Sequence, residues 1–361
     1  MLSVSGEYGI INQIEFQGRS FAGESVAEYH VVETNDIVYT KSPLKANPYG
    51  IIKVNNGAPG IVSTLYAVYH PCEGTVAEYI DYYFGNDLRL NKYLKPLVNI
   101  GAKHDMKVNN ETVLTGEVYF PGYSEQKKIV GFLTILDERI RQQRNLVEAL
   151  KKYKRGVMQK VFRNMSAFSP SGFETVRLSD IFKKASRRNS NGEIKNVITN
   201  SAEHGLIPQR DFFDKDIAVD GNTGNYYVIE YGDFVYNPRK SNTAPYGPFN
   251  RYERQEKGII SPLYTCLVLK ADIEPAYLAW YFKSDAWYRY IYDNGSQGVR
   301  HDRVSMTDDL LMGMPVIIPS KDSQIKIAKL LDCLEKRFQV ELSQCEYLKT
   351  VREALLQQLF I

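Results

Sequence analysis

Basic side chains beside glycine turns are the residues of this 361-residue chain whose types and spacing suggest chemistry. The stretch 101–105 is Gly-Ala-Lys-His-Asp, and the stretch 295–303 is Gly-Ser-Gln-Gly-Val-Arg-His-Asp-Arg. Glycine permits close approach of a backbone, and Lys, Arg and His beside it reach phosphates or guanine edges. The two stretches predict contact with nucleic acid, and the alternative is an ordinary solvated loop.

A second kind of basic loop precedes a Pro-Tyr-Gly turn, once before Gly50 and once before Gly247. Lys and Arg in such loops supply phosphate contacts that set position, and Arg also reads base edges. The candidate DNA-contacting residues from all these loops are Lys41, Lys45, Lys103, His104, Arg239, Lys240, Arg251, Arg254, Arg300, His301 and Arg303.

Motifs for catalysis, nucleotide phosphates and metals are absent from the sequence. It contains neither a Gly-x-x-x-x-Gly-Lys-Ser/Thr loop nor a dinucleotide fingerprint after a strand. His70 and Cys72 form a lone pair of possible ligands, and a loop explains them better than a metal site. We therefore expect no catalytic residues, no metal and no cofactor bound by this chain.

Composition narrows the class of protein without identifying a partner. Apolar content of 43% and charged content of 24% are typical of a soluble globular chain. The net charge of +3 allows nucleic acid but does not require it. No apolar run approaches the ~20 residues that cross a bilayer, and the N-terminus does not resemble a signal peptide. We expect a cytoplasmic protein with no membrane partner.

The order of turns and apolar segments occurs twice along the chain. The stretch 119–162 aligns without a gap with 317–360, and other pairs of stretches match at offsets of 196 to 198 residues. Repeats of this kind predict a two-unit architecture. Residues 169–196 have no counterpart in the first copy, so we expect that copy to lack its first element, an opening strand and turn at 175–181 in the second copy.

Each copy should contain a strand at 61–69 or its equivalent, a helix starting near 76–84, and an apolar strand that ends in Pro121 or Pro319. A long helix follows each of these prolines. Apolar residues recur on these helices at alternate spacings of four and three, which predicts a coiled-coil seam. The seam residues are Ile129, Leu133, Leu136, Ile140, Val147, Leu150, Ile327, Leu331, Leu334, Phe338, Leu348 and Leu355.

Polar residues interrupt both seams at the same two places, Gln143 and Lys154 in one helix and Glu341 and Arg352 in the other. Matching polar layers indicate that each helix has the other as its partner. The alternative is two separate helices, each packed on its own globular domain.

At these residues the chain resembles the specificity (S) subunit of type I restriction–modification systems, over nearly its whole length. The resemblance rests on the boundary pattern of an apolar strand, a proline, then Glu-Gln and a basic helix start, Phe120 to Ile129 in the first copy. The second copy keeps Gln324 and Ile327 but has Ser323 in place of the Glu.

The resemblance implies an α+β fold, with two similar globular α/β target-recognition domains separated by a pair of long antiparallel coiled-coil helices. The domains implied are target-recognition domain 1 over 1–120 (N-terminally short), spacer helix 1 over 121–165, target-recognition domain 2 over 166–319 and spacer helix 2 over 320–361.

The resemblance further implies that each globular domain reads one half of a bipartite, asymmetric site in double-stranded DNA. The partners implied are two modification (methyltransferase) subunits and restriction (endonuclease/translocase) subunits, to which S-adenosylmethionine, ATP and Mg belong. The alternatives are a recognition fragment of a fused restriction–methyltransferase and a non-catalytic coiled-coil scaffold that binds protein or sugar. The DNA motif itself does not follow from the sequence.

Overall fold

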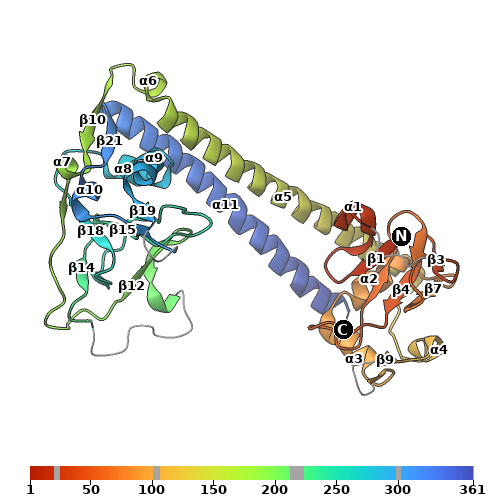
Figure 1. The fold of residues 1–361 in the computed structure, drawn as a ribbon. Coiled ribbons are helices and arrows are strands. Elements are labelled where there is room, and N and C mark those ends of the chain that lie inside the picture. The colour runs from red at the N-terminus through yellow and green to blue at the C-terminus, as the bar shows by residue number, and fades with distance from the viewer. Residues whose placement is uncertain (20–24, 101–105, 212–222, 298–301, 361) are drawn as a thin grey trace. The chain divides into compact units, whose positions relative to one another are not determined.

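The computed structural model describes residues 1–19, 25–100, 106–211, 223–297 and 302–360. Helices and strands alternate throughout this part of the chain (Figure 1), so the prediction of a mixed helix and sheet fold is confirmed. None of the helices in the described ranges is long and apolar enough to span a membrane.

The chain forms two compact units. Unit 1 comprises Met1–Asn145 and Leu342–Ile361, and unit 2 comprises Leu146–Glu341. The long helices α5 (Tyr123–Arg163) and α11 (Lys321–Leu359) therefore each contribute one part to either unit. The four boundaries implied by the family resemblance, which set each helix apart from the globular domains, stay a prediction.

Unit 1 is built from short antiparallel strand pairs packed against helices. The pairings are β1–β2, β3–β6, β5–β4–β7 and β8–β9. The strands are β1 (Leu2–Ser5), β2 (Gly9–Asn12), β3 (His30–Val32), β4 (Ile37–Thr40), β5 (Ile52–Val54), β6 (Gly60–Val62), β7 (Tyr66–Tyr69), β8 (Asn99–Ile100) and β9 (Met106–Lys107). The shorter helices are α1 (Gln13–Gln17), α2 (Ala77–Phe84), α3 (Asp87–Leu94) and α4 (Asn110–Val113).

Unit 2 repeats this order of elements. Its hairpin β12–β13, the pair β14–β17, the sheet β16–β15–β18 and the pair β19–β20 match the four groups of unit 1. The strands are β12 (Ile198–Ser201), β13 (Gly205–Pro208), β14 (Tyr227–Ile229), β15 (Phe234–Tyr236), β16 (Phe249–Arg251), β17 (Gly258–Ile260), β18 (Thr265–Leu269), β19 (Ser296–Gln297) and β20 (Val304–Ser305). The helices are α6 (Met165–Phe168), α7 (Leu178–Ile181), η1 (Gln209–Asp211), α8 (Pro275–Lys283), α9 (Tyr288–Asn294) and α10 (Asp308–Met312).

Unit 2 has three further strands. These are β10 (Phe173–Arg177), β11 (Phe182–Lys184) and β21 (Pro315–Pro319). β10 pairs with β21, and β11 adds a fourth strand to the edge of β18. Both β10 and β11 come from the stretch 169–196 that has no counterpart in the first copy, and β10 followed by α7 corresponds to the opening strand and turn expected there.

Two details of the expected secondary structure in unit 1 are wrong. The residues before Pro121 form no strand, although their equivalents in unit 2 form β21. The physical reason is that β21 is held by the ladder to β10, and the described part of unit 1 contains no such partner. The expected strand 61–69 is instead β6 and β7, separated by a turn at 63–65 that closes with a hydrogen bond from Tyr66 N to Ser63 O of 3.0 Å. The helix expected near 76–84 is confirmed as α2.

The Pro-Tyr-Gly turns have the same construction in both units. Gly50 and Gly247 have φ of +91° and +84°, and a Cβ at either position would overlap a backbone carbonyl oxygen, that of Thr40 or that of Asn237. Glycine is therefore the only residue that fits. Tyr39 Oη donates to Tyr49 O at 2.8 Å, and Tyr236 Oη donates to Tyr246 O at 2.9 Å. These contacts fix the ends of the two loops that carry the candidate basic residues.

The glutamine of the boundary pattern also has the same role twice. The Gln126 side chain accepts from Val76 N at 2.9 Å and donates to Pro121 O at 2.9 Å. The Gln324 side chain accepts from Glu274 N at 2.8 Å and donates to Pro319 O at 2.8 Å. Each buried amide joins the proline before a long helix to the N-terminus of α2 or α8, where backbone N–H groups lack helical partners.

Within each unit the two long helices run antiparallel. In unit 1, Leu133 of α5 and Leu356 of α11 belong to one core cluster, and one turn further along α5 Asp137 pairs with Arg352. In unit 2, Lys154 Nζ lies 2.5 Å from Glu335 Oε2. The alignment of the two copies makes Asp137 equivalent to Glu335 and Lys154 equivalent to Arg352. Each unit therefore contains an ion pair between an acidic and a basic residue at equivalent positions.

Candidate nucleic-acid interface

The structure joins two of the candidate basic loops of unit 2 into one cluster. Arg239 and Arg303 form an antiparallel bridge, and the backbone N–H of Lys240 donates to Asp302 O at 2.9 Å. Val304 N donates to Pro238 O at 2.9 Å on the other side of the bridge. Residues about 60 positions apart in the sequence therefore present three cationic side chains together, which we name the basic cluster (Arg239, Lys240 and Arg303).

Buried amides hold the first of these loops in place. Asn200 Nδ2 donates to Val235 O at 2.8 Å, and its Oδ1 accepts from Asn250 Nδ2 at 2.7 Å. Asn237 Nδ2 donates to Asn200 O at 3.2 Å, while its Oδ1 accepts from Arg239 N at 3.0 Å. All three asparagines are buried. A satisfied buried network of this kind rigidifies the backbone that carries the basic cluster.

The charges of the basic cluster remain accessible to an anionic ligand. The Arg239 side chain is 66% exposed, and its Nε lies 3.5 Å from Asp302 Oδ2. Arg303 Nε lies 3.9 Å from the same oxygen. Exposed ion pairs contribute only about 0–1 kcal/mol, so a phosphate can replace Asp302 as the partner at little cost. Burial raises the pKa of nearby Tyr264, although Arg239 and Arg303 act to lower it.

A shallow groove runs along Arg239 and Lys240 of the basic cluster. Its volume is about 290 Å³, and its lining includes Ser201, Glu203, Arg239, Lys240 and Thr243. Hydroxyl and cationic groups of this kind bind phosphate oxygens. The groove therefore combines accessible cations with short polar side chains on a rigid loop.

Two further candidates of unit 2 do not take part in the ion pairs of the basic cluster. Arg251 lies over the ring of Tyr231 at 5.3 Å, and its Nη1 is 3.9 Å from Glu253 Oε1. Arg254 Nη2 lies 3.6 Å from Asp211 Oδ2. Arg251 is partly buried, whereas Arg254 is exposed.

In unit 1 the candidate loop carries a half-buried Lys41 and an exposed Lys45. The loop closes through reciprocal hydrogen bonds between Leu44 and Asn47 backbones, and Asn47 Nδ2 donates to Asp87 Oδ1 at 2.9 Å. The amides of the unit 2 network are replaced at the equivalent positions by Val4, Thr40 and Lys53. The two units therefore hold their basic loops by different means. The candidates Lys103, His104, Arg300 and His301 lie outside the described residues.

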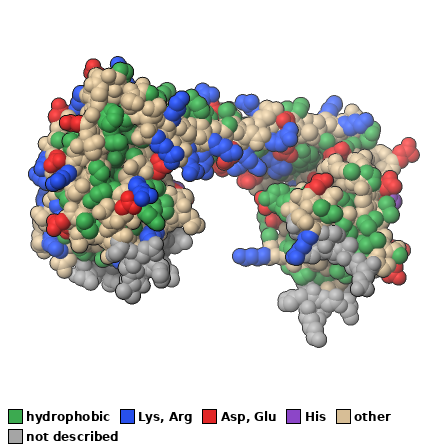
Figure 2. All heavy atoms as spheres, turned by 45° about the horizontal axis from the view of Figure 1, so that its top comes forward, with side chains coloured by type: hydrophobic (Ala, Val, Ile, Leu, Met, Phe, Trp, Pro, Cys, Tyr) green, Lys and Arg blue, Asp and Glu red, His purple; other side chains and the backbone are tan. Residues whose placement is uncertain are grey.

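The sequence reasoning missed an exposed basic surface on α5. Its part in unit 2 carries six Lys or Arg residues against the single acid Glu148. Lys154 is bound to Glu335, whereas Lys151, Lys152, Arg155 and Lys160 are exposed. Figure 2 shows Lys and Arg side chains gathered along the long helices. The charge run Lys-Lys-Tyr-Lys-Arg at 151–155 is the signal that could have identified this surface.

All twelve residues of the predicted seam are at least partly buried. Leu133, Ile140, Val147, Ile327 and Leu331 are buried, and the other seven are partly buried. The polar layers differ in kind, because Lys154 and Arg352 form the ion pairs described above while Gln143 and Glu341 are themselves buried. Burial acts to raise the pKa of Glu335, but hydrogen bonds from Lys154 and Gln339 and the Lys154 charge lower it overall.

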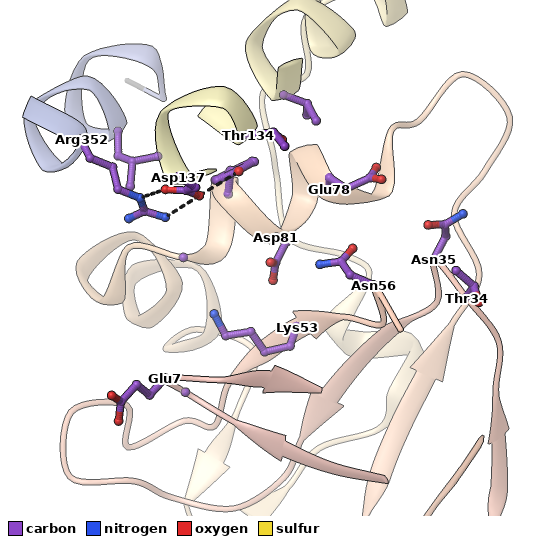
Figure 3. A pocket seen from close by; sticks show the side chains of 15 residues that line it. Glu7, Thr34, Asn35, Lys53, Asn56, Glu78, Asp81, Thr134, Asp137 and Arg352 are labelled. Atoms are coloured by element: carbon purple, nitrogen blue, oxygen red, sulfur yellow. Dashed lines mark hydrogen bonds and ion pairs between the residues drawn. The ribbon is translucent and has the colours of Figure 1, made fainter. Parts of the chain in front are cut away.

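Unit 1 also contains a polar pocket of about 720 Å³ that the sequence did not indicate. Figure 3 shows Asp81 reaching into it from α2, Lys53 from β5, and Arg352 with Asp137 at its wall. Burial raises the pKa of Asp81, although the positive charge of Lys53 acts to lower it. Tyr82 Oη donates to Asp137 Oδ2 at 2.9 Å, and burial is the main cause that raises its pKa to about 12.

The groups around this pocket provide no metal-binding set. Among the described residues, no group of three or more His, Cys, Asp or Glu side chains is placed to hold a metal ion. The Asp137 carboxylate is already engaged by Arg352 and Tyr82. The charged and polar residues that line the pocket therefore come both from the pair of long helices and from the sheet and α2 of unit 1.

Comparison by sequence finds nothing, whereas comparison by structure does. No protein-family model and no curated protein matches the chain. The HsdS subunit from Thermoanaerobacter tengcongensis is 17% identical, with 91% of this chain and 81% of that chain covered and a TM-score of 0.49. A chain from a structure of complex assembly and conformational transition of the type I R-M system is 17% identical, with 93% and 84% covered and a TM-score of 0.55. The type I restriction-modification S subunit from M. genitalium is 14% identical, with 92% and 84% covered and a TM-score of 0.51.

These matches define the class of fold. The chain shares its fold with S subunits of type I restriction–modification systems. The present chain has that fold over more than nine tenths of its length.

Proposed function

We propose that this chain is the DNA sequence-specificity subunit of a type I restriction–modification complex. The observation that carries the proposal is the S-subunit fold, shared over 93% of the chain. The internal duplication supports it, because two similar units suit a target with two parts. The rigid basic cluster of unit 2 supports it as well, since phosphate contacts set the position of a protein on DNA.

In this proposal each unit reads one half of an interrupted DNA site. The half-sites differ, because the basic loops differ in sequence and are held by different contacts in the two units. The candidate residues of the loops and the exposed cations of α5 provide phosphate contacts, and Arg side chains read base edges. The helices α5 and α11 pair as an antiparallel coiled coil that sets the distance between half-sites.

The chemistry belongs to the partners in this proposal. Two modification subunits dock on the paired helices and methylate adenine with S-adenosylmethionine, and restriction subunits with ATP and Mg join them. This chain supplies no catalytic group and binds no cofactor of its own.

The test is methylome sequencing of a host that expresses this chain with its modification subunits. The expected result is adenine methylation at one interrupted, two-part, asymmetric motif. A matched chain carrying Arg239→Gln and Lys240→Gln should lose methylation at that motif while the complex still assembles. An assembled complex that methylates no interrupted motif would contradict the proposal.

A further inference from the structure

An acidic side chain lies at the tip of a hairpin turn that borders the basic cluster. The turn between β12 and β13 reads Ser-Ala-Glu-His-Gly over 201–205, and Glu203 at its tip is exposed. Glu203 lines the shallow groove of about 290 Å³ together with Arg239 and Lys240. A carboxylate repels phosphate, so its function in this groove differs from that of the cations beside it.

The turn that carries Glu203 has a defined backbone. Ser201 Oγ accepts from Glu203 N at 3.3 Å and from His204 N at 3.2 Å. Gly205 follows with φ of +71°, in the left-handed region that favours glycine. Local hydrogen bonds therefore hold the backbone on which the Glu203 side chain is presented.

Buried amides join this turn to the loop that carries Arg239. Asn250 Nδ2 donates to Ser201 O at 3.0 Å and to Asn200 Oδ1 at 2.7 Å. The Asn237 side chain donates to Asn200 O at 3.2 Å and accepts from Arg239 N at 3.0 Å. One network thus contacts both segments, and it fixes the position of the acid relative to the cations.

The Glu203 carboxylate is available to a ligand. Among the residues that the structure describes, none forms a hydrogen bond or an ion pair with this carboxylate. Arg239 pairs with Asp302 instead. The carboxylate can therefore accept a hydrogen bond from a donor that enters the groove.

The same turn with the same acid occurs in unit 1. Ser5 Oγ accepts from Glu7 N at 3.3 Å and from Tyr8 N at 3.2 Å, and Gly9 has φ of +71°. Figure 3 shows Glu7 on this turn, beside the polar pocket that it lines. The residues on either side of the glutamate differ between the two turns. An acid at the same position of both turns, between neighbours that differ, indicates a function of the carboxylate itself.

The chemistry of base edges selects the donor. In the major groove cytosine presents its N4 amino group, from which a glutamate accepts. Adenine also presents an amino group there, but the N7 acceptor beside it repels a carboxylate. Guanine N7 and O6 and thymine O4 are acceptors. A carboxylate that lies beside phosphate-binding cations is therefore best matched by cytosine.

We propose that Glu203 reads a cytosine in the half-site of unit 2, by accepting a hydrogen bond from the N4 amino group in the major groove. This inference rests on the proposed function, because it names a base contact made by the same surface. Arg239 and Lys240 bind neighbouring phosphates, and the buried amides set the position of the base contact relative to them.

The test compares the methylated motifs of complexes that contain the unmodified chain, Glu203→Gln or Glu203→Ala. Glutamine pairs with adenine through N6 and N7. We expect Glu203→Gln to accept A as well as C at one position of one half-site, and Glu203→Ala to accept any base there. In competition binding with duplexes that carry C or A at that position, Glu203→Gln should lower the preference for C at least ~5-fold, the lower end of the cost of one mismatch.

The matched control is Glu174→Gln, which removes an exposed carboxylate from β10, at the opposite end of unit 2 from β12 (Figure 1). This control should leave the motif unchanged. The inference would be overturned by an unchanged motif with both Glu203 variants, by a change at a position other than C·G, or by the same change with the control.

An equal rise in affinity for every duplex with Glu203→Gln would also overturn the inference, because the carboxylate would then only repel the DNA backbone. Failure of the proposed function gives a different result. In that case the complex with the unmodified chain methylates no interrupted motif, and the inference fails with it.

Discussion

The basic cluster of unit 2 yields a quantitative prediction about DNA binding. The perturbation is the triple substitution Arg239→Gln, Lys240→Gln and Arg303→Gln. These side chains lie on one bridged pair of loops, where Arg239 and Arg303 share the exposed carboxylate of Asp302. Neutralising them removes cationic groups without removing any of the buried amide contacts that hold the loop.

The magnitude follows from counterion release. Each phosphate neutralised by a cation contributes about 0.9 to the slope of log affinity against log salt. Three lost contacts should therefore lower the slope by about 2.7. Between ~50 and ~200 mM salt, the unmodified complex should lose about 40-fold more affinity than the variant.

The assay is fluorescence anisotropy with a DNA duplex that contains the methylated motif, using the chain assembled with its modification subunits. A matched control removes three exposed charges of unit 2 away from the loops, through Lys270→Gln, Lys283→Gln and Arg289→Gln. The control should keep the original slope. An unchanged slope for the basic-cluster variant, or an equal fall for the control, would refute the assignment of phosphate contacts to these loops.

Three predictions concern stability. Gln324→Met should lower the free energy of unfolding by about 1–3 kcal/mol in urea denaturation, because Glu274 N and Pro319 O lose their buried partner, whereas the exposed Gln339→Met on the same helix should change little. Phe182→Ala should cost about 3–5 kcal/mol by removing a fully buried ring, whereas the half-exposed Phe173→Ala should cost far less, and an equal effect of the two would contradict the packing of β11. Asp81→Asn should stabilise the protein at neutral pH, because burial raises the pKa of this carboxyl in the folded state and so its ionisation opposes folding. That gain should be largest above the folded-state pKa and should vanish as pH falls below the unfolded value of ~3.9, which thermal melts across pH would detect.

Local signals in the sequence account for much of the secondary structure of both units. Helix α2 follows from apolar residues at helical spacing, and the Pro-Tyr-Gly turns follow from residues that only a tight turn requires. The irregular backbone before Pro121 does not follow in this way. Its residues are as apolar as those of β21, yet a strand exists only where a partner completes its hydrogen bonds.

The candidate site shows the same division. Residue type and the neighbouring turns are enough to identify Arg239, Lys240 and Arg303 as candidates from the sequence. These three residues come together because a bridge joins two loops about 60 residues apart and because the buried amides around Asn200 hold one of those loops. Neither contact is indicated by a local pattern in the sequence. The polar pocket around Asp81 is likewise assembled from β5, α2 and both long helices.

The amino-acid sequence by itself predicts the duplication, the turns and the long helices, because periodicity and turn chemistry act over a few neighbouring residues. It also gives the types of residue in the basic loops. Which loops share one surface, which strand edges are paired and which apolar groups stay uncovered depend instead on contacts between segments distant in the chain, and these emerge with the folded structure. In particular, the residues before Pro121 form no strand, whereas their equivalents in unit 2 form β21, because β10 lies against β21 and the described part of unit 1 contains no such partner.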